Sequence, residues 1–170
     1  MKRLIPLLFS LLLAFTAFGA DPSNEITAEN VIRLMNEYRA GEGLAPIGSD
    51  TRLTQAAADR MRHMEDEAFW GHESPEGVTP FVWLRTRAYD FQTAGENLAA
   101  GFETARLLVQ SWMESPGHRD NIMSADFEDC GIAVIEGSTK GPATGKSIVV
   151  LFGKKRENTE ALVARGVRQP

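Results

Sequence analysis

The chain has 170 residues and a formal net charge of −5 at pH 7, from 23 acidic and 18 basic residues. This length suits one compact domain, and an acidic chain with scattered lysines and arginines is a poor match for nucleic acid or an anionic membrane surface. Cys130 is the only cysteine, so the chain cannot form an internal disulfide. Its apolar neighbours indicate a small buried side chain rather than a nucleophile.

Residues 1–20 have the pattern of a secretory leader. Lys2 and Arg3 precede an almost wholly apolar stretch over residues 4–18, and small residues follow it. That stretch is shorter than the ~20 residues of a comfortable membrane span, although an uncleaved N-terminal anchor is the alternative. Because the leader holds two basic residues and no acidic one, its removal changes the net charge from −5 to −7. We expect an exported bacterial protein, secreted or periplasmic, with no membrane span after cleavage.

The rest of the chain divides into three parts. Residues 21–26 are expected to form a short mobile lead-in, residues 27–153 one domain, and residues 154–170 a charged C-terminal tail with a last helical turn at 159–164. Nothing in the sequence indicates an internal repeat or a second domain.

Apolar residues at helical spacing predict four helices within the domain. They begin after Thr27, after Ser49 or Asp50, at Thr79-Pro80 and after Thr104, where each of these residues suits a first turn or a cap. His63 falls off the apolar line and is expected on the solvated surface. The predicted inward faces are Val31, Leu34, Met35 and Tyr38; Leu53, Ala57, Arg60, Met61 and Met64; Phe81, Leu84 and Ala88; and Leu107 or Leu108, Ser111 and Trp112.

Two later runs, residues 130–135 and 147–152, combine small, β-branched and apolar residues as strands do. A polar, glycine-rich loop at 137–146 joins them as a hairpin. Leu98 to Ala100 is expected to form a short third strand. Because helices precede strands along the chain, the order favours an α+β fold with an antiparallel sheet.

Three polar segments, residues 71–75, 95–98 and 110–123, carry the candidate chemistry. They hold His72, Glu96 and His118, and the last segment is expected to end a helix and turn at Pro116-Gly117 just before its histidine. The three side chains are 24 and 22 residues apart, so only the fold could bring them into one cleft. Together they would form a three-ligand set for zinc or a similar divalent cation with a position open for water. Without metal, the same trio is an acid–base pair steered by a carboxylate, and the sequence leaves both open.

Each of these residues also has a purely structural explanation, as a loop histidine, a turn glutamate and a helix-capping histidine.

Two other patterns resemble catalytic motifs but lack parts that those motifs require. His72-Glu73 lacks the second histidine of the zinc-protease helix, and Pro75 would break that helix. Ser115 precedes His118 by three residues but has no glycine-flanked elbow, so a capping or turn role is favoured.

In their order along residues 27–153, these motifs resemble the CAP (SCP-like) superfamily of cysteine-rich secretory, antigen 5 and plant pathogenesis-related 1 proteins. The resemblance is strongest to the bacterial branch of the YkwD type. The segments that carry it are Asn36-Glu37-Tyr38-Arg39, Gly43-Leu44-Ala45-Pro46-Ile47, Leu53-Thr54-Gln55-Ala56-Ala57, Gly71-His72, Gly95-Glu96-Asn97-Leu98-Ala99, residues 112–122, and Phe127 with Gly131-Ile132-Ala133-Val134.

The resemblance implies a three-layer α-β-α sandwich, with about four helices around a small three-stranded antiparallel sheet and an open cleft. Carried over residue by residue, it places the cleft histidines at His72 and His118 and the cleft glutamate at Glu96. A second cleft glutamate is implied near Glu114, where the segment of this chain is shorter. The disulfides of eukaryotic relatives are missing, which leaves stability to helix–sheet packing.

The sequence therefore predicts an exported binding module whose cleft holds a divalent metal and engages a small ligand or an envelope protein, as a monomer. An inherited cleft without an occupant is the plain alternative. A hydrolase of peptide or cell-wall substrates, with His72, Glu96 and His118 catalytic and Glu73 or Glu114 as base, is a second. A lipid or sterol carrier is a third, and it would need an exposed apolar groove near Phe69-Trp70 or Phe81-Trp83. Arg119 and Asn121 either line the cleft or support its turn from behind.

Overall fold

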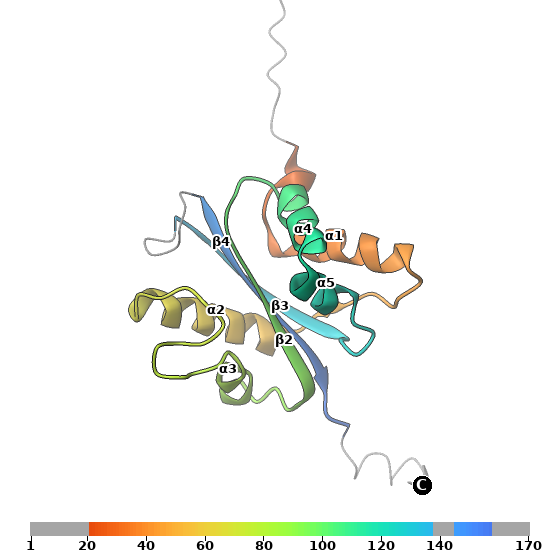
Figure 1. The fold of residues 1–170 in the computed structure, drawn as a ribbon. Helices are drawn as coiled ribbons and strands as arrows, with labels where there is room; N and C mark the ends of the chain where they lie inside the picture. The colour runs from red at the N-terminus through yellow and green to blue at the C-terminus, as the bar shows by residue number, and fades with distance from the viewer. Residues whose placement is uncertain (1–20, 138–144, 158–170) are drawn as a thin grey trace, which may run out of the picture.

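The computed structural model describes residues 21–137 and 145–157, so the predicted leader, the middle of the hairpin loop and the last helical turn lie outside it. Figure 1 shows three layers, with the sheet between α2 and α3 on one side and α1, α4 and α5 on the other. The predicted α-β-α sandwich is therefore confirmed. The elements in chain order are η1 Pro22–Asn24, α1 Ala28–Gly41, β1 Gly48–Ser49, α2 Thr51–Asp66, α3 Phe81–Thr86, β2 Phe91–Phe102, α4 Ala105–Glu114, α5 Pro116–Met123, β3 Asp129–Glu136 and β4 Lys146–Lys155.

The sheet has four strands in the order β1-β3-β4-β2. The long strands β2, β3 and β4 pair antiparallel as predicted, and β1 adds a two-residue parallel pair beside the start of β3. The sequence missed β1 because a Gly-Ser pair has no strand pattern. The strand predicted at Leu98 to Ala100 covers Phe91–Phe102, because the polar residues of Gly95-Glu96-Asn97 concealed its first half.

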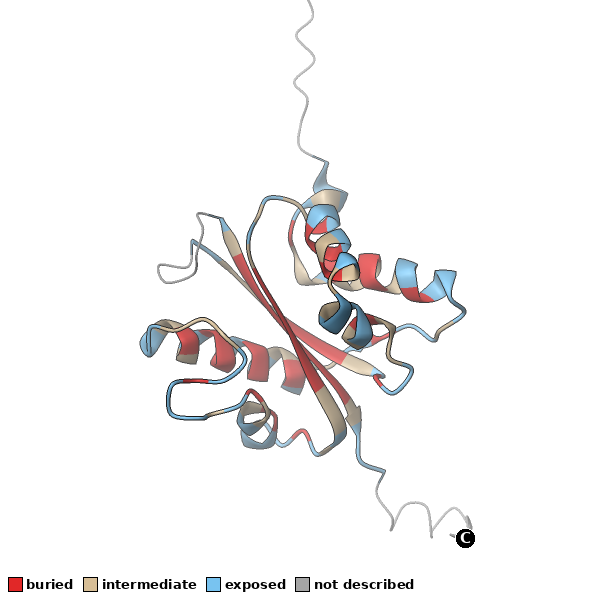
Figure 2. Cartoon of the chain, viewed as in Figure 1, coloured by how far each residue is buried: buried red, intermediate tan, exposed pale blue. Residues whose placement is uncertain are grey.

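Apolar side chains fill two clusters, one on each face of the sheet. Figure 2 shows the buried segments along the middle of the strands and on the helix faces turned toward them. Gly131 makes the tightest helix–sheet contact, because a Cβ placed on it would lie 2.0 Å from the carbonyl carbon of Leu53. The helix α2 therefore rests directly on the backbone of β3.

Three helices begin where the sequence predicted, since Thr27, Asp50 and Thr104 each accept a hydrogen bond from a first-turn backbone N–H. Asp50, rather than Ser49, is the cap of α2. Helix α3 is shorter than expected: Pro80 precedes it, and Ala88 lies exposed beyond its end with a φ of +54°.

Several predictions about which side chains are buried were wrong. On α1 the inward residue is Arg39, which is 1% exposed, while Tyr38 is 40% exposed. Arg39 is buried because its guanidinium donates to the carbonyls of Ala45, Ile122 and Ser124 at 2.7–2.8 Å. On α4, Ser111 is half-buried rather than buried, and the choice that the sequence left open is decided, with Leu108 buried and Leu107 exposed.

Two further expectations need correction. Pro116 does not turn the chain away from a helix; it is the first residue of α5, a position that suits its fixed φ and missing N–H. His118 therefore lies in the first turn of a helix. His63 is half-buried rather than solvated, with its ring centroid 5.1 Å from that of Phe69 and 5.3 Å from that of Trp83.

The contact at Gly131 gives a stability test. Replacing Gly131 by Ala places a methyl group against the backbone of α2, so we expect a loss of roughly 1–3 kcal/mol or more in the free energy of unfolding, measured with denaturant. The control is Gly41→Ala at the end of α1, where a Cβ meets nothing within 4 Å and stability should be unchanged or slightly higher. Equal stabilities for the two variants would contradict the packing of α2 on β3.

Candidate functional site

The candidate site is built around Arg60, a buried guanidinium on α2 that is 0% exposed. Its Nε donates to Glu96 Oε2 at 3.1 Å, and an Nη donates to the carbonyl of Gly71. Its guanidinium carbon lies 5.2 Å from the centroid of the Phe69 ring. Arg60 therefore joins three parts of the chain that are far apart in sequence: the helix α2, the loop before His72 and the strand β2.

Glu96 is the meeting point of this arrangement. One carboxylate oxygen accepts from Arg60, and the other lies 2.8 Å from His72 Nδ1. The glutamate is almost completely buried, whereas the side chain of His72 is 61% exposed. A buried carboxylate thus fixes one nitrogen of a histidine that is otherwise open to solvent, which is how a protein selects a tautomer and a ring orientation.

His118 reaches the same place from the opposite layer. Asn97 on β2 donates to the carbonyl of His118 at 3.1 Å. Asn121, one turn further along α5, donates to the carbonyl of Glu96 at 3.1 Å and to Asn97 Oδ1 at 2.8 Å. Two asparagines therefore attach the first half of α5 to the strand that carries Glu96.

These side chains line one hollow of about 290 Å³. The expected convergence of His72, Glu96 and His118 is present in the structure, because the lining residues are His72, Glu96, Ser115, Gly117, His118 and Asn121.

The two histidines of the hollow differ in their electrostatics. The hydrogen bond to Glu96 raises the pKa of His72 above its ordinary value of 6.5, against the opposing effect of burial. Burial lowers the pKa of His118, and the nearby charge of His72 lowers it further. Near neutral pH the hollow therefore favours a neutral imidazole at His118 and a more basic one at His72.

The other predicted neighbours lie apart from this hollow or at its margin. Asn121 both lines it and supports β2. Glu114 accepts from Gln110 at 2.9 Å and lines a separate hollow beside Leu107. Glu73 and Arg119 are exposed and do not line the hollow that holds the two histidines.

The sequence placed Arg60 on the inward face of α2 but gave it no role. The signal was a charged residue in line with Leu53, Ala57 and Met64, since a fully buried arginine needs hydrogen-bond partners for its donors. No sequence feature identified Glu96 as its partner, because 36 residues separate them.

Within residues 21–137 and 145–157, no group of three or more His, Cys, Asp or Glu side chains is arranged to hold a metal ion. Both oxygens of Glu96 already face Arg60 and His72. The three-ligand set of His72, Glu96 and His118 therefore stays a prediction. What the described geometry offers a cation is two imidazoles, with Glu96 behind one of them.

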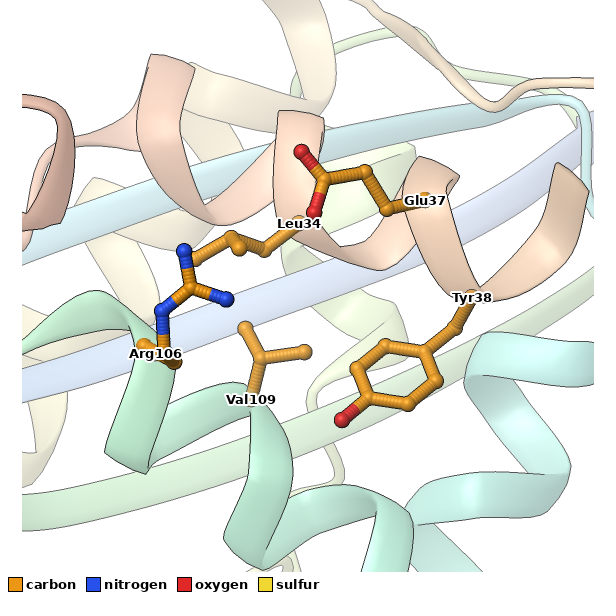
Figure 3. Close-up of a pocket in the computed structure, with 5 residues that line it drawn as sticks. All are labelled: Leu34, Glu37, Tyr38, Arg106 and Val109. Atoms are coloured by element: carbon orange, nitrogen blue, oxygen red, sulfur yellow. The ribbon is translucent and has the colours of Figure 1, made fainter. Parts of the chain in front are cut away.

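A second hollow of about 210 Å³ lies between α1 and α4 (Figure 3). Leu34 and Val109 contribute apolar surface, and the side chains of Glu37, Tyr38 and Arg106 surround it. The aromatic residues that a lipid carrier was expected to use do not lie here. Phe69, Trp70 and Trp83 are half-buried and pack against the core cluster under α2.

Comparison with known proteins supports the sequence resemblance. The model of the cysteine-rich secretory protein family, or CAP, matches residues 32–151. The chain belongs to this family. It does so without the cysteines of the family's name, since its single cysteine, Cys130, is buried and free.

Two proteins of Bacillus subtilis are similar to this chain in sequence. The uncharacterized protein YkwD is 33% identical over 121 residues, which cover 71% of this chain and 47% of YkwD. The uncharacterized membrane protein YlbC is 27% identical over 106 residues, covering 62% of this chain and 31% of YlbC. The chain thus spans less than half the length of either relative.

Solved structures of other bacterial proteins have a similar fold. An extracellular protein containing an SCP domain from Bacillus anthracis is 26% identical with a TM-score of 0.63, covering 75% of this chain and 40% of that one. An outer surface protein of Borrelia burgdorferi is 23% identical with a TM-score of 0.66, covering 75% of this chain and 92% of that one. At this identity the second likeness concerns the fold alone.

The contrast between the two histidines is directly testable. By NMR titration of the imidazole protons, His72 should titrate above and His118 below about 6.5. In Glu96→Gln the pKa of His72 should fall toward or below that value, because the charged acceptor is lost. Unchanged titration of His72 in this variant would contradict the contact.

The same contact sets a pH dependence of stability. Because the folded pKa of His72 is raised, its charged contact with Glu96 stabilises fully below the unfolded pKa of about 6.5 and is lost as pH rises through the folded pKa. The difference in free energy of unfolding between wild type and His72→Gln should therefore shrink between about pH 6 and pH 8. Chemical denaturation at each pH measures it, and a difference that grows with pH would refute it.

Proposed function

We propose that this CAP domain is an exported binding module whose cleft takes a divalent metal cation between the imidazoles of His72 and His118. The observation that carries the proposal is the convergence of both histidines on one hollow of about 290 Å³, with Glu96 fixing His72 from behind. Neutral imidazole is a good ligand for zinc and similar cations.

The residues present fit such an ion as two nitrogen ligands with an outer carboxylate. A metal-ligating histidine commonly gives its other ring nitrogen to a carboxylate, and His72 Nδ1 has that partner in Glu96. Within the described residues, His72 Nε2 has no hydrogen-bond partner. For Glu96 itself to become a third ligand, it would have to give up Arg60 or His72.

The low pKa of His118 supports its role, because the ligand must be unprotonated. A bound cation would act as a Lewis acid, and its remaining positions would suit oxygen atoms of a carboxylate-bearing ligand or of an envelope partner. His72 and His118 would hold the ion, Glu96 would keep His72 oriented, and Arg60 would hold Glu96 in place.

Export is supported by the leader pattern of residues 1–20 and by the solved relative from Bacillus anthracis, which is described as extracellular. Among the residues that the structure describes, no helix is long and apolar enough to cross a membrane. The outer surface protein of Borrelia burgdorferi shares only the fold.

One observation favours a second function, hydrolysis by acid–base chemistry without metal. The pKa of His72 is raised and that of His118 is lowered within one hollow, which is the separation that an acid and a base need. Ser115 also lines this hollow. This alternative predicts turnover of peptide or cell-wall substrates in the presence of a chelator, reduced by roughly 10²–10⁴-fold in His118→Ala.

Metal binding is tested by thermal unfolding of the purified protein, first with a chelator and then with added zinc. At ~100 times its dissociation constant, zinc should stabilise by ~2.7 kcal/mol, which raises the midpoint by several degrees. The shift should disappear in His72→Ala/His118→Ala. It should persist in His63→Gln, since that histidine lies on α2 against Phe69 and Trp83 and glutamine keeps an acceptor for Arg60, whose Nη1 is 3.4 Å from His63 Nδ1. A shift that is absent in wild type, or lost equally in His63→Gln, would contradict the metal proposal.

A further inference from the structure

The connection between α2 and α3, residues 67–80, contains no helix or strand, yet it carries His72 (Figure 1). Just before the histidine this connection is fixed, because the carbonyl of Gly71 accepts a hydrogen bond from the buried guanidinium of Arg60. The side chain of His72 is exposed, and its one hydrogen bond within the described chain is the contact with Glu96. What holds the connection after His72 therefore decides how firmly the imidazole meets Glu96.

Ser74 is the buried polar residue on that side, with 5% exposure. Its hydroxyl oxygen accepts from the backbone N–H groups of Glu76 and Val78, both at 3.2 Å, and its proton goes to Glu76 Oε2 at 2.9 Å. The backbone of Ser74 adds two bonds, since its N–H donates to the carbonyl of Val78 at 3.0 Å and its carbonyl accepts from the N–H of Gly77 at 2.9 Å. One hydroxyl thus lies at the centre of a closed turn over residues 74–78.

These bonds leave Ser74 no direct part in ligand chemistry. A serine hydroxyl has one donor and two acceptor positions, and all three are used within the turn. Ser74 also does not line the hollow that holds the two histidines. Any effect of Ser74 on the cleft must therefore act through the position of His72, two residues before it.

The turn limits how far His72 can move. With the turn formed, only His72 and Glu73 lie between the fixed carbonyl of Gly71 and Ser74. Without it, residues 72–78 would form one free stretch, since no other backbone hydrogen bond in the described chain holds them. Ordering the backbone of one residue weakens an equilibrium by roughly five- to thirtyfold, so a contact that must order its own loop forms less often.

We propose that Ser74 is a positioning residue for His72, whose closed turn holds the imidazole with Nδ1 against Glu96 and leaves Nε2 free for the cation. The inference rests on the proposed function in so far as His72 is a metal ligand. A ligand that is fixed before the ion arrives binds it more tightly, because its ordering is not taken from the free energy of binding.

The contact with Glu96 also determines which nitrogen of a neutral His72 carries the proton. A carboxylate accepts hydrogen bonds, so the proton stays on Nδ1 and Nε2 keeps a free lone pair, which a cation needs. If the turn opens, the imidazole can leave Glu96 and the form with its proton on Nε2 becomes available. The ratio of the two tautomers therefore reports the effect of the turn on His72 without any metal.

Nitrogen-15 NMR of the metal-free protein, at a pH where His72 is neutral, tests the proposal with Ser74→Ala. The ratio of the Nδ1–H to the Nε2–H tautomer should fall by roughly fivefold or more, because the contact must then order part of the loop. The control Thr104→Ala removes a helix cap on α4 and should keep the wild-type ratio. An unchanged ratio in Ser74→Ala overturns the proposal, and so does an equal fall in Thr104→Ala.

A second variant loosens the turn without changing Ser74, for the case in which Ser74→Ala does not fold. Gly77 has a φ of +81°, which favours glycine, and a Cβ there would lie 3.4 Å from Glu73 Oε1. Gly77→Ala should speed amide exchange at Val78 and lower the same tautomer ratio. The matched control is Gly43→Ala, with a φ of +71° after α1, which should leave the ratio unchanged. Faster exchange at Val78 with a wild-type ratio overturns the proposal.

Zinc titration by calorimetry separates this inference from the proposed function. The dissociation constant for zinc should rise by roughly five- to thirtyfold in Ser74→Ala and stay unchanged in Thr104→Ala. If the wild type binds no zinc, the proposed function fails while the tautomer ratio still decides the role of Ser74. If zinc binds to wild type and to Ser74→Ala equally well, the role of Ser74 is overturned and the proposed function is not.

Discussion

The buried guanidinium of Arg60 is the interaction on which the rest of the cleft depends. Removing a charged group from water costs several kcal/mol, so a residue that is 0% exposed must have its donors satisfied. Glu96 and the carbonyl of Gly71 accept from two of its nitrogens, and the third lies 3.4 Å from His63 Nδ1. The requirement that Arg60 be paired therefore fixes where β2 and the His72 loop lie relative to α2.

The other layer is attached by a second buried arginine. Arg39 on α1 donates to carbonyls at the end of α5 and just beyond it, at Ile122 and Ser124. The asparagine pair of Asn97 and Asn121 then joins α5 to β2. The helix that carries His118 is thus held from both sides, and the hollow lies where the two layers meet over the strand β2.

This division of roles explains the contrast between the two histidines. His72 comes from a loop and takes its orientation from one buried carboxylate, which raises its pKa. His118 lies on α5, which is held to β2 by Asn97 and Asn121 rather than by the imidazole itself. Burial is therefore the largest influence on the imidazole of His118, and it lowers the pKa. The proposed metal binding and the alternative acid–base chemistry both use this difference in pKa between the two histidines. They differ in the protonation state of His72, which is neutral as a metal ligand and protonated as a general acid.

The sequence predicted the features that depend on local chemistry. The caps at Thr27 and Thr104 are single-residue signals, and they were correct. Helix periodicity alone could not decide that Arg39 is buried in place of Tyr38, because its carbonyl partners lie up to 85 residues away. The first half of β2 was missed for the same kind of reason, since its polar residues are buried by contacts with other elements.

The candidate site divides in the same way. Its histidines and Glu96 were identified from their polar settings and from the family resemblance, which places them in one cleft. The hydrogen bond between Glu96 and Arg60 was not identified, because nothing near either residue in sequence indicates the other. The parallel pairing of β1 with β3 could not be predicted either, since its two residues, Gly48 and Ser49, carry no strand pattern.

The most direct test of this account is a double-mutant cycle on Arg60 and Glu96, read as the free energy of unfolding in denaturant. Each single change, Arg60→Met or Glu96→Gln, leaves a buried group without its charged partner and should cost about 3–5 kcal/mol. The double variant should cost less than the sum by roughly 1–3 kcal/mol, because neither charge then remains unpaired. Additive losses, within about 0.5 kcal/mol, would mean that the two residues act independently and that Arg60 does not organise the cleft.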